Sequence, residues 1–174
     1  EKLLKSGSAD TAAAAFEALG DFRDAADRAR QIRYESAEKL AKTDWAAAAA
    51  AFDKLADYSD SADRANALRY NAAAQVALSG DWQSAAAMYE ALGDYSDSAD
   101  KALQVRYQAA AQMAARQEWD EAVALYAELG DYADSADRIP ITRYAQAQSV
   151  EEAGEYLAAA RLYKALGGSD TVAP

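Results

Sequence analysis

The sequence predicts an all-α protein, an α-solenoid of stacked antiparallel helical hairpins, on the basis of three observations. Alanine is the commonest of the 174 residues, whereas glycine occurs 8 times and proline twice, so the composition favours helices over strands. Similar strings recur at a period of 36 and then 37 residues; they are LGDFRDAADRARQIRY from Leu19, LADYSDSADRANALRY from Leu55, LGDYSDSADKALQVRY from Leu92 and LGDYADSADRIPITRY from Leu129. A second pattern keeps this period, with aromatic residues at Trp45, Trp82, Trp119 and Tyr156 and again seven residues later. Such periods are typical of solenoids built from stacked supersecondary units.

We expect residues 1-174 to form a single array of about 4.5 helix-turn-helix repeats. The repeats cover a partial first unit at 1-20, full units at 21-56, 57-93, 94-130 and 131-167, and a C-terminal tail at 168-174. We call the first, longer helix of each full unit helix A and the second helix B.

The repeat at 57-93 shows the signals that place its two helices. Helix A is expected from about Ser61 to Ser79, with Asp60 as its N-cap and Asp63 as the acidic partner of a capping box. Gly80 and Asp81 form the turn. Helix B runs from about Trp82 to Leu92 and ends at a glycine able to adopt the left-handed conformation; such glycines occur at Gly20, Gly93, Gly130 and Gly167.

One face of helix B carries the predicted core. The residues Trp82, Ala85, Ala86, Tyr89 and Leu92 recur at spacings of three, four and seven, so they share one helical face. Small alanines there allow neighbouring helices to approach closely, and burial of each aromatic side chain contributes roughly 1.5–3 kcal/mol.

The pattern departs from regularity near its beginning and in its last repeat. Residues 1–7 match only the tail of a helix A, placed before a helix B that contains Phe16. The segment between Tyr34 and Trp45 is one residue short. Pro140 falls near the start of the last helix A, where we expect it to kink or delay the helix.

The residues Ala77-Leu78-Ser79-Gly80-Asp81-Trp82, followed by Ala85 and Tyr89, resemble the centre of a tetratricopeptide repeat, in which a glycine and an aromatic residue open the second helix. Similar residues recur around Trp45, Trp119 and Tyr156. The resemblance implies a right-handed array whose A helices line a concave, peptide-binding surface.

Composition and charge exclude most classes of catalytic, metal-binding and nucleic-acid-binding site. The chain has no histidine and no cysteine, which removes imidazole catalysis, thiol nucleophiles, disulfides and metal sites with nitrogen or sulfur ligands. Its net charge of -11 argues against nucleic acid as a partner, and no apolar run is long enough for membrane insertion. The absence of cysteine fits an extracellular or a cytoplasmic protein, and we slightly favour an extracellular or cell-surface location.

The repeated polar residues predict structural roles rather than sites. We interpret Asp57, Asp60, Asp63 and their copies as helix caps, with weak calcium binding as the alternative. The arginines Arg33, Arg69, Arg106 and Arg143 fit salt bridges between repeats, or a basic stripe for an acidic peptide. Carboxylates are periodic, whereas an active site breaks repeat symmetry, so we expect no enzyme, no cofactor and no metal.

Both ends of the array lack the polar cap that solitary solenoids carry. We therefore expect a non-catalytic structural protein that associates with itself head-to-tail into a filament or higher oligomer. The residues expected at that interface are Leu3, Leu4, Phe16, Tyr156, Tyr163 and Leu166.

The alternative function is a monomeric scaffold that binds a peptide or protein, or a fragment of a longer scaffold of this kind. Its groove would be lined by residues of the A helices; the candidates are Tyr34, Tyr70, Asn71, Tyr107, Gln108 and Tyr144. Most aromatic side chains are nevertheless expected to pack in the core or between repeats.

Overall fold

The computed structural model describes residues 2–20 and 22–167. These residues form nine helices and no strand, which confirms the predicted all-α class. The helices are α1 (Lys2–Glu17), α2 (Ala25–Leu40), α3 (Trp45–Asp53), α4 (Ser61–Leu78), α5 (Trp82–Glu90), α6 (Ser98–Ala115), α7 (Trp119–Leu129), α8 (Ser135–Glu152) and α9 (Tyr156–Gly167).

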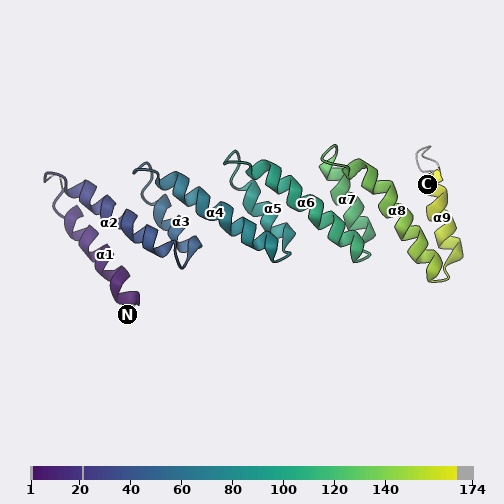
Figure 1. The fold of residues 1–174 in the computed structure, drawn as a ribbon, viewed down its shortest axis with the longest axis horizontal. Coiled ribbons are helices and arrows are strands. Elements are labelled where there is room, and N and C mark those ends of the chain that lie inside the picture. The colour runs from purple at the N-terminus through teal and green to yellow at the C-terminus, as the bar shows by residue number, and fades with distance from the viewer. Residues whose placement is uncertain (1, 21, 168–174) are drawn as a thin grey trace.

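The helices pack in chain order into an elongated array, with α1 and α9 at opposite ends (Figure 1). The A helices are α2, α4, α6 and α8, and they alternate with the B helices α3, α5, α7 and α9. Loops that join a helix B to the next helix A lie along one long edge, and the turns within each hairpin lie along the other (Figure 1). This arrangement confirms the predicted α-solenoid.

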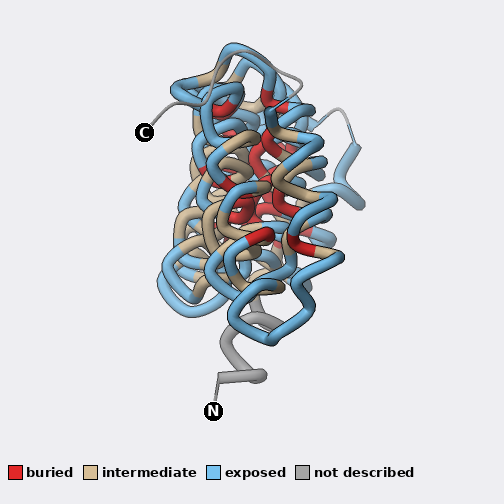
Figure 2. The backbone as a smooth tube through the Cα atoms, turned by 90° about the vertical axis from the view of Figure 1, so that its right-hand side faces the viewer, coloured by how far each residue is buried: buried red, intermediate tan, exposed pale blue. Residues whose placement is uncertain are grey.

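Alanine dominates the core. Among the described residues, the fully buried alanines come from seven different helices; they are Ala13, Ala48, Ala73, Ala85, Ala110, Ala122 and Ala147. The large buried side chains between them are Phe52, Tyr89 and Tyr126. Seen along the array, buried residues lie between the two layers of helices (Figure 2). Small side chains at the helix contacts allow the backbones to approach, so each aromatic ring is enclosed by its neighbours.

The predicted helix B face is confirmed in α5. Ala85, Ala86 and Tyr89 are buried there in one cluster with Ala73 of α4. Trp82 and Leu92 are half-buried and pack against the same cluster. The period of the apolar residues therefore identifies the face of helix B that packs in the core.

Two details of the sequence prediction need correction. Residues 2–8 do not end a separate helix A, because α1 continues without a turn through Ser6, Gly7 and Ser8. A single glycine inside a helix costs only about 1 kcal/mol relative to alanine, so Gly7 does not by itself end the helix. Pro140 does not delay α8, which begins at Ser135, the position equivalent to Ser98 in α6. Proline at this point removes a single intrahelical hydrogen bond.

The ends of α1, α3, α5 and α7 are each followed by a left-handed residue, whereas Gly167, predicted to end the last helix B in the same way, is the final residue of α9 and has no positive φ. Gly20, Gly93 and Gly130 have φ values of 57°, 55° and 56°, and Ala56 takes the same conformation, at 49°, in the repeat that lacks the glycine. A Cβ atom is strained in this region, whereas glycine is not. Ala56 therefore weakens its own turn.

We predict that Ala56→Gly stabilises the protein by about 1 kcal/mol, because it removes this strain. The reverse change at the equivalent position, Gly93→Ala, should destabilise by a similar amount. Urea unfolding followed by circular dichroism measures both. A neutral or destabilising Ala56→Gly would contradict the assignment of strain to this turn.

Candidate functional site

Three of the predicted groove tyrosines connect successive repeats. Tyr70 of α4 donates its hydroxyl hydrogen bond to Asp97 Oδ1, at the start of α6, over 2.5 Å. Tyr34 makes the same bond to Asp60, and Tyr107 makes it to Asp134. Each aspartate directly precedes the next helix A, so every bond links one helix A to the following one. We call each tyrosine with its aspartate a Tyr–Asp clamp.

Aromatic contacts enclose the tyrosine of each clamp. The Tyr34 ring lies edge-on to Phe52 of α3, with centroids 5.3 Å apart, and to Tyr58 in the following loop, at 5.9 Å. The equivalent partners are Tyr89 and Tyr95 for Tyr70, and Tyr126 and Tyr132 for Tyr107. Contacts of this geometry add to the stabilisation from apolar burial. The clamp therefore has an apolar contact along the ring and a polar one at its tip.

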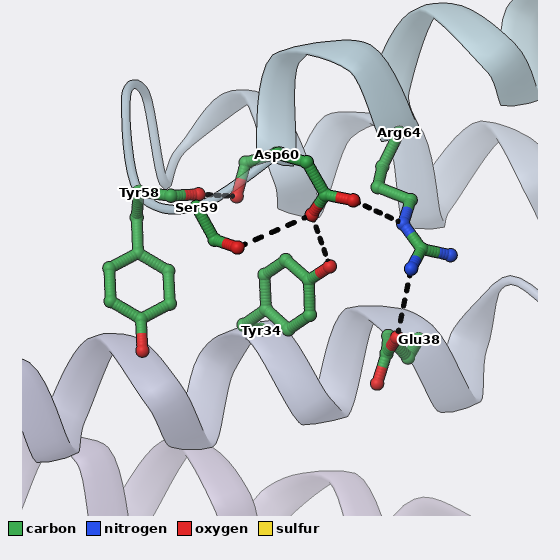
Figure 3. Close-up of polar contacts among 7 residues, drawn as sticks. Tyr34, Glu38, Tyr58, Ser59, Asp60 and Arg64 are labelled. Atoms are coloured by element: carbon green, nitrogen blue, oxygen red, sulfur yellow. Dashed lines mark hydrogen bonds and ion pairs between the residues drawn. The ribbon is translucent and has the colours of Figure 1, made fainter.

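In the clamps of Asp60 and Asp134, the second carboxylate oxygen binds a cation. Asp60 Oδ2 accepts a hydrogen bond of 3.0 Å from Arg64 Nε, and Arg64 also lies 3.6 Å from Glu38 of α2 (Figure 3). Asp134 has the equivalent partner Arg138, at 2.9 Å. These aspartates were predicted to cap their helices, but their side chains make no capping bond. Their oxygens instead bind a tyrosine of the preceding repeat or a cation on the same helix.

Hydrogen bonding across the clamp shifts the pKa values of both partners. The tyrosine hydroxyls lower the pKa of Asp60, Asp97 and Asp134, because a donated hydrogen bond favours the charged carboxylate. The carboxylate of Asp97 raises the pKa of Tyr70 to about 12, since ionising the phenol would lose the bond and place two negative charges together.

The repeated arginines form the predicted salt bridges between helices. Arg106 of α6 binds Glu90 of α5 at 2.7 Å, and Arg33 and Arg69 bind Glu17 and Asp53 in the same way. The last copy differs, because an alanine occupies position 127. Arg143 binds Asp120 there instead.

The remaining predicted groove residues differ in exposure. Asn71 and Gln108 are exposed. Tyr144, the fourth residue of the tyrosine series, is 44% exposed, and its ring lies 5.6 Å from that of Tyr163. Within the described residues, Tyr144 has no aspartate partner of the clamp type. The side chain of Tyr144 is therefore exposed, whereas those of the other three tyrosines are half-buried.

The residues predicted for self-association lie at the two ends. The side chains of Leu3 and Leu4 fall outside the described part of the structure. Phe16, Tyr163 and Leu166 are half-buried, and Tyr163 donates a hydrogen bond of 2.9 Å to Glu151. Tyr156 is 70% exposed, and its neighbour Leu157 is 81% exposed.

A cavity that the sequence analysis missed lies between α6, α7 and α8. It has a volume of about 290 Å³ and is lined by Ala111, Ala114, Trp119, Tyr126, Arg138, Ile141, Thr142 and Ala145. Its α8 wall breaks the repeat symmetry. Ile141 replaces Gln104 of α6, and Ala145 replaces Gln108. The substitution of two polar residues by two apolar ones was the sequence signal for this cavity.

Metal ligation and membrane insertion find no support in the described residues. Among them no group of histidine, cysteine, aspartate or glutamate side chains is arranged so that it could hold a metal ion. This result includes the repeated aspartate clusters. In the same part of the chain, no helix is long and apolar enough to span a membrane.

Comparison of the chain with protein-family models, curated proteins and solved structures finds no match. We therefore infer the function from the cavity and from the exposed surfaces of the molecule.

We predict that Tyr70→Phe lowers the free energy of unfolding by about 1 kcal/mol, because it removes a hydrogen bond between repeats. Tyr144→Phe is the matched control, since Tyr144 has no clamp aspartate among the described residues, and it should leave stability almost unchanged. Urea unfolding of both variants tests the difference. Equal effects at the two positions would contradict the role of the clamp.

The clamp also predicts a pH dependence. The raised pKa of Tyr70 means that its contribution to stability is complete below the ordinary value of 10.0 and is lost as the pH rises towards 12. The lowered pKa of Asp97 means that its contribution is present above the ordinary value of 3.8 and is lost below it.

Urea midpoints measured from pH 3 to about 11 should therefore fall at both extremes. The triple variant Tyr34→Phe, Tyr70→Phe, Tyr107→Phe should show a weaker fall on the alkaline side. An unchanged alkaline fall in this variant would contradict the prediction.

Proposed function

We propose that the chain is a non-catalytic, tetratricopeptide-like scaffold that binds a polypeptide segment on the surface formed by its A helices. The cavity between α6, α7 and α8 carries this proposal, since it is mainly apolar and lies where the preceding repeat has glutamines. A binding site for one ligand requires a surface that differs from the equivalent surfaces of the other repeats, and this departure lies at the wall of the cavity.

The size and lining of the cavity favour a side chain of a polypeptide as its occupant. A volume of about 290 Å³ lies at the lower limit of pockets for small ligands and accommodates one large apolar side chain. Trp119, Ile141 and Ala145 provide apolar walls. Arg138 is held by Asp134, which leaves no free acid, base or nucleophile pair to support catalysis.

Exposed apolar side chains extend the surface beyond the cavity. Ile141 is 54% exposed and lies one helical turn from Tyr144 on α8. Their spacing of three residues places both on neighbouring positions of the helix surface. A bound segment would cover this apolar area, which favours a polypeptide over a compact molecule.

We predict that a peptide-display library panned against the protein yields binders that depend on the cavity. The double variant Ile141→Gln, Ala145→Gln should reduce their affinity by about tenfold or more, since it removes the apolar wall. It introduces the residues found at the same positions of α6, so the fold should tolerate it. Ala67→Gln, at the position of α4 equivalent to Ile141, is the matched control. Failure to enrich any binder, or binders that ignore the double variant, would contradict the proposal.

Self-association remains a second proposal, supported by the exposed Tyr156 and Leu157 on α9. The fold sets a constraint on it, because α1 carries the helix B aromatic Phe16 and α9 is also a helix B. Regular continuation of the array from one copy to the next would need a helix A between them. Light scattering over a concentration series tests this proposal; an increase in mass that Tyr156→Glu abolishes would support it, and a monomer at every concentration would exclude it.

A further inference from the structure

We propose that the segment bound at the α6–α8 cavity is basic, with lysine or arginine flanking one large apolar side chain. This inference rests on the proposed scaffold function and specifies its ligand. Residues 98–152, which form the cavity and its surroundings, contain ten carboxylates and five basic side chains. A segment that approaches this surface therefore meets a negative potential.

The carboxylate of Asp134, at the start of α8, is bound to the cavity-lining Arg138, whereas two other exposed carboxylates, on α8 and α6, are unpaired within the described residues. Asp137 precedes Ile141 by four residues, so one helical turn, about 6 Å of rise, separates them on the same face. Asp100 occupies the equivalent position on α6. Both are exposed, and neither takes part in an ion pair within the described part of the chain. They are therefore free to pair with an incoming cation.

Two of the basic side chains nearby are already engaged, whereas Arg116, between the lining residues Ala114 and Trp119, makes no ion pair within the described residues. Arg138, which lines the cavity, donates to Asp134 over 2.9 Å, and Arg143 binds Asp120. Both cations are neutralised within the protein and offer little attraction to an acidic ligand. The other end of α8 carries the exposed Glu151 and Glu152. The apolar centre of this surface thus has acidic side chains towards both ends of α8, which selects for an apolar residue with basic flanks.

Three fluorescein-labelled nonapeptides test this inference by fluorescence anisotropy with the full chain. The first has a central leucine between lysines and arginines, the second replaces the leucine by serine, and the third replaces the basic flanks by glutamates. The first should bind best. The second should bind about tenfold more weakly, because it lacks the side chain that fills the cavity. The third should show no measurable binding.

Variants of the protein separate the two parts of the site. Ile141→Gln should weaken the leucine peptide about tenfold, with Ala145→Gln as a second variant if the first fails to fold. The double variant Asp100→Asn, Asp137→Asn should weaken binding by about twofold or more and reduce its dependence on salt. Glu35→Gln, on α2, removes an equally exposed carboxylate far along the array and should leave binding unchanged.

The outcomes distinguish the inference from the proposed function. If the glutamate-flanked peptide binds as well as the basic one, and Ile141→Gln weakens both, the ligand chemistry is wrong and the scaffold proposal stands. If the basic peptide binds equally to wild type and to the Ile141→Gln and Ala145→Gln variants, it attaches to acidic surface elsewhere, and the inference fails. If none of the three peptides binds, the inference is overturned, and the display experiment decides the scaffold proposal separately.

Discussion

The Tyr–Asp clamp is the interaction on which the array depends. A single helical hairpin cannot bury its own apolar face, so each repeat needs the next one. The clamp makes this dependence specific, because the tyrosine of one helix A packs against one ring of its own repeat and one ring of the next, and donates its hydrogen bond to the aspartate that opens the next helix A. The recurring LGDYSDSAD loop of the sequence supplies these parts together. In Tyr58-Ser59-Asp60-Ser61, Tyr58 contacts the clamp ring, Asp60 accepts its hydrogen bond, and the buried Ser61 donates to the Tyr58 carbonyl.

The helices could largely be predicted from the sequence, because their determinants are local. Apolar spacing and glycine stops place α4 and α5 within about two residues, and the alanine face of α5 is buried as expected. The role of Asp60 could not be predicted in this way. Asp44 and Asp81 also precede helices, and both cap them, by accepting from Ala47 N at 2.9 Å and Ser84 N at 3.1 Å. Asp60 differs from these caps in its tertiary contact with Tyr34 and in its backbone, whose ψ of 26° compares with 96° at Asp44 and 71° at Asp81.

The candidate site was missed for a related reason. Ile141 and Ala145 occupy positions that hold glutamines in α6, but nothing in the sequence shows that their face of α8 borders a cavity. Self-association was the first hypothesis from the sequence and remains untested. The helix B character of both α1 and α9 restricts how copies could join, whereas the cavity needs no second copy. Repetition thus supplies the frame of the molecule, and the departures from repetition indicate where a ligand would bind.

A double-mutant cycle on Tyr70 and Asp97 tests most directly that the clamp couples the repeats. The variants are Tyr70→Phe, Asp97→Ala and their combination, each measured by urea unfolding at neutral pH. If the clamp acts as described, the double variant loses little more stability than either single variant, because each change alone already breaks the bond. Strictly additive losses would show that the two side chains contribute independently, and would contradict the view that this bond holds one repeat to the next.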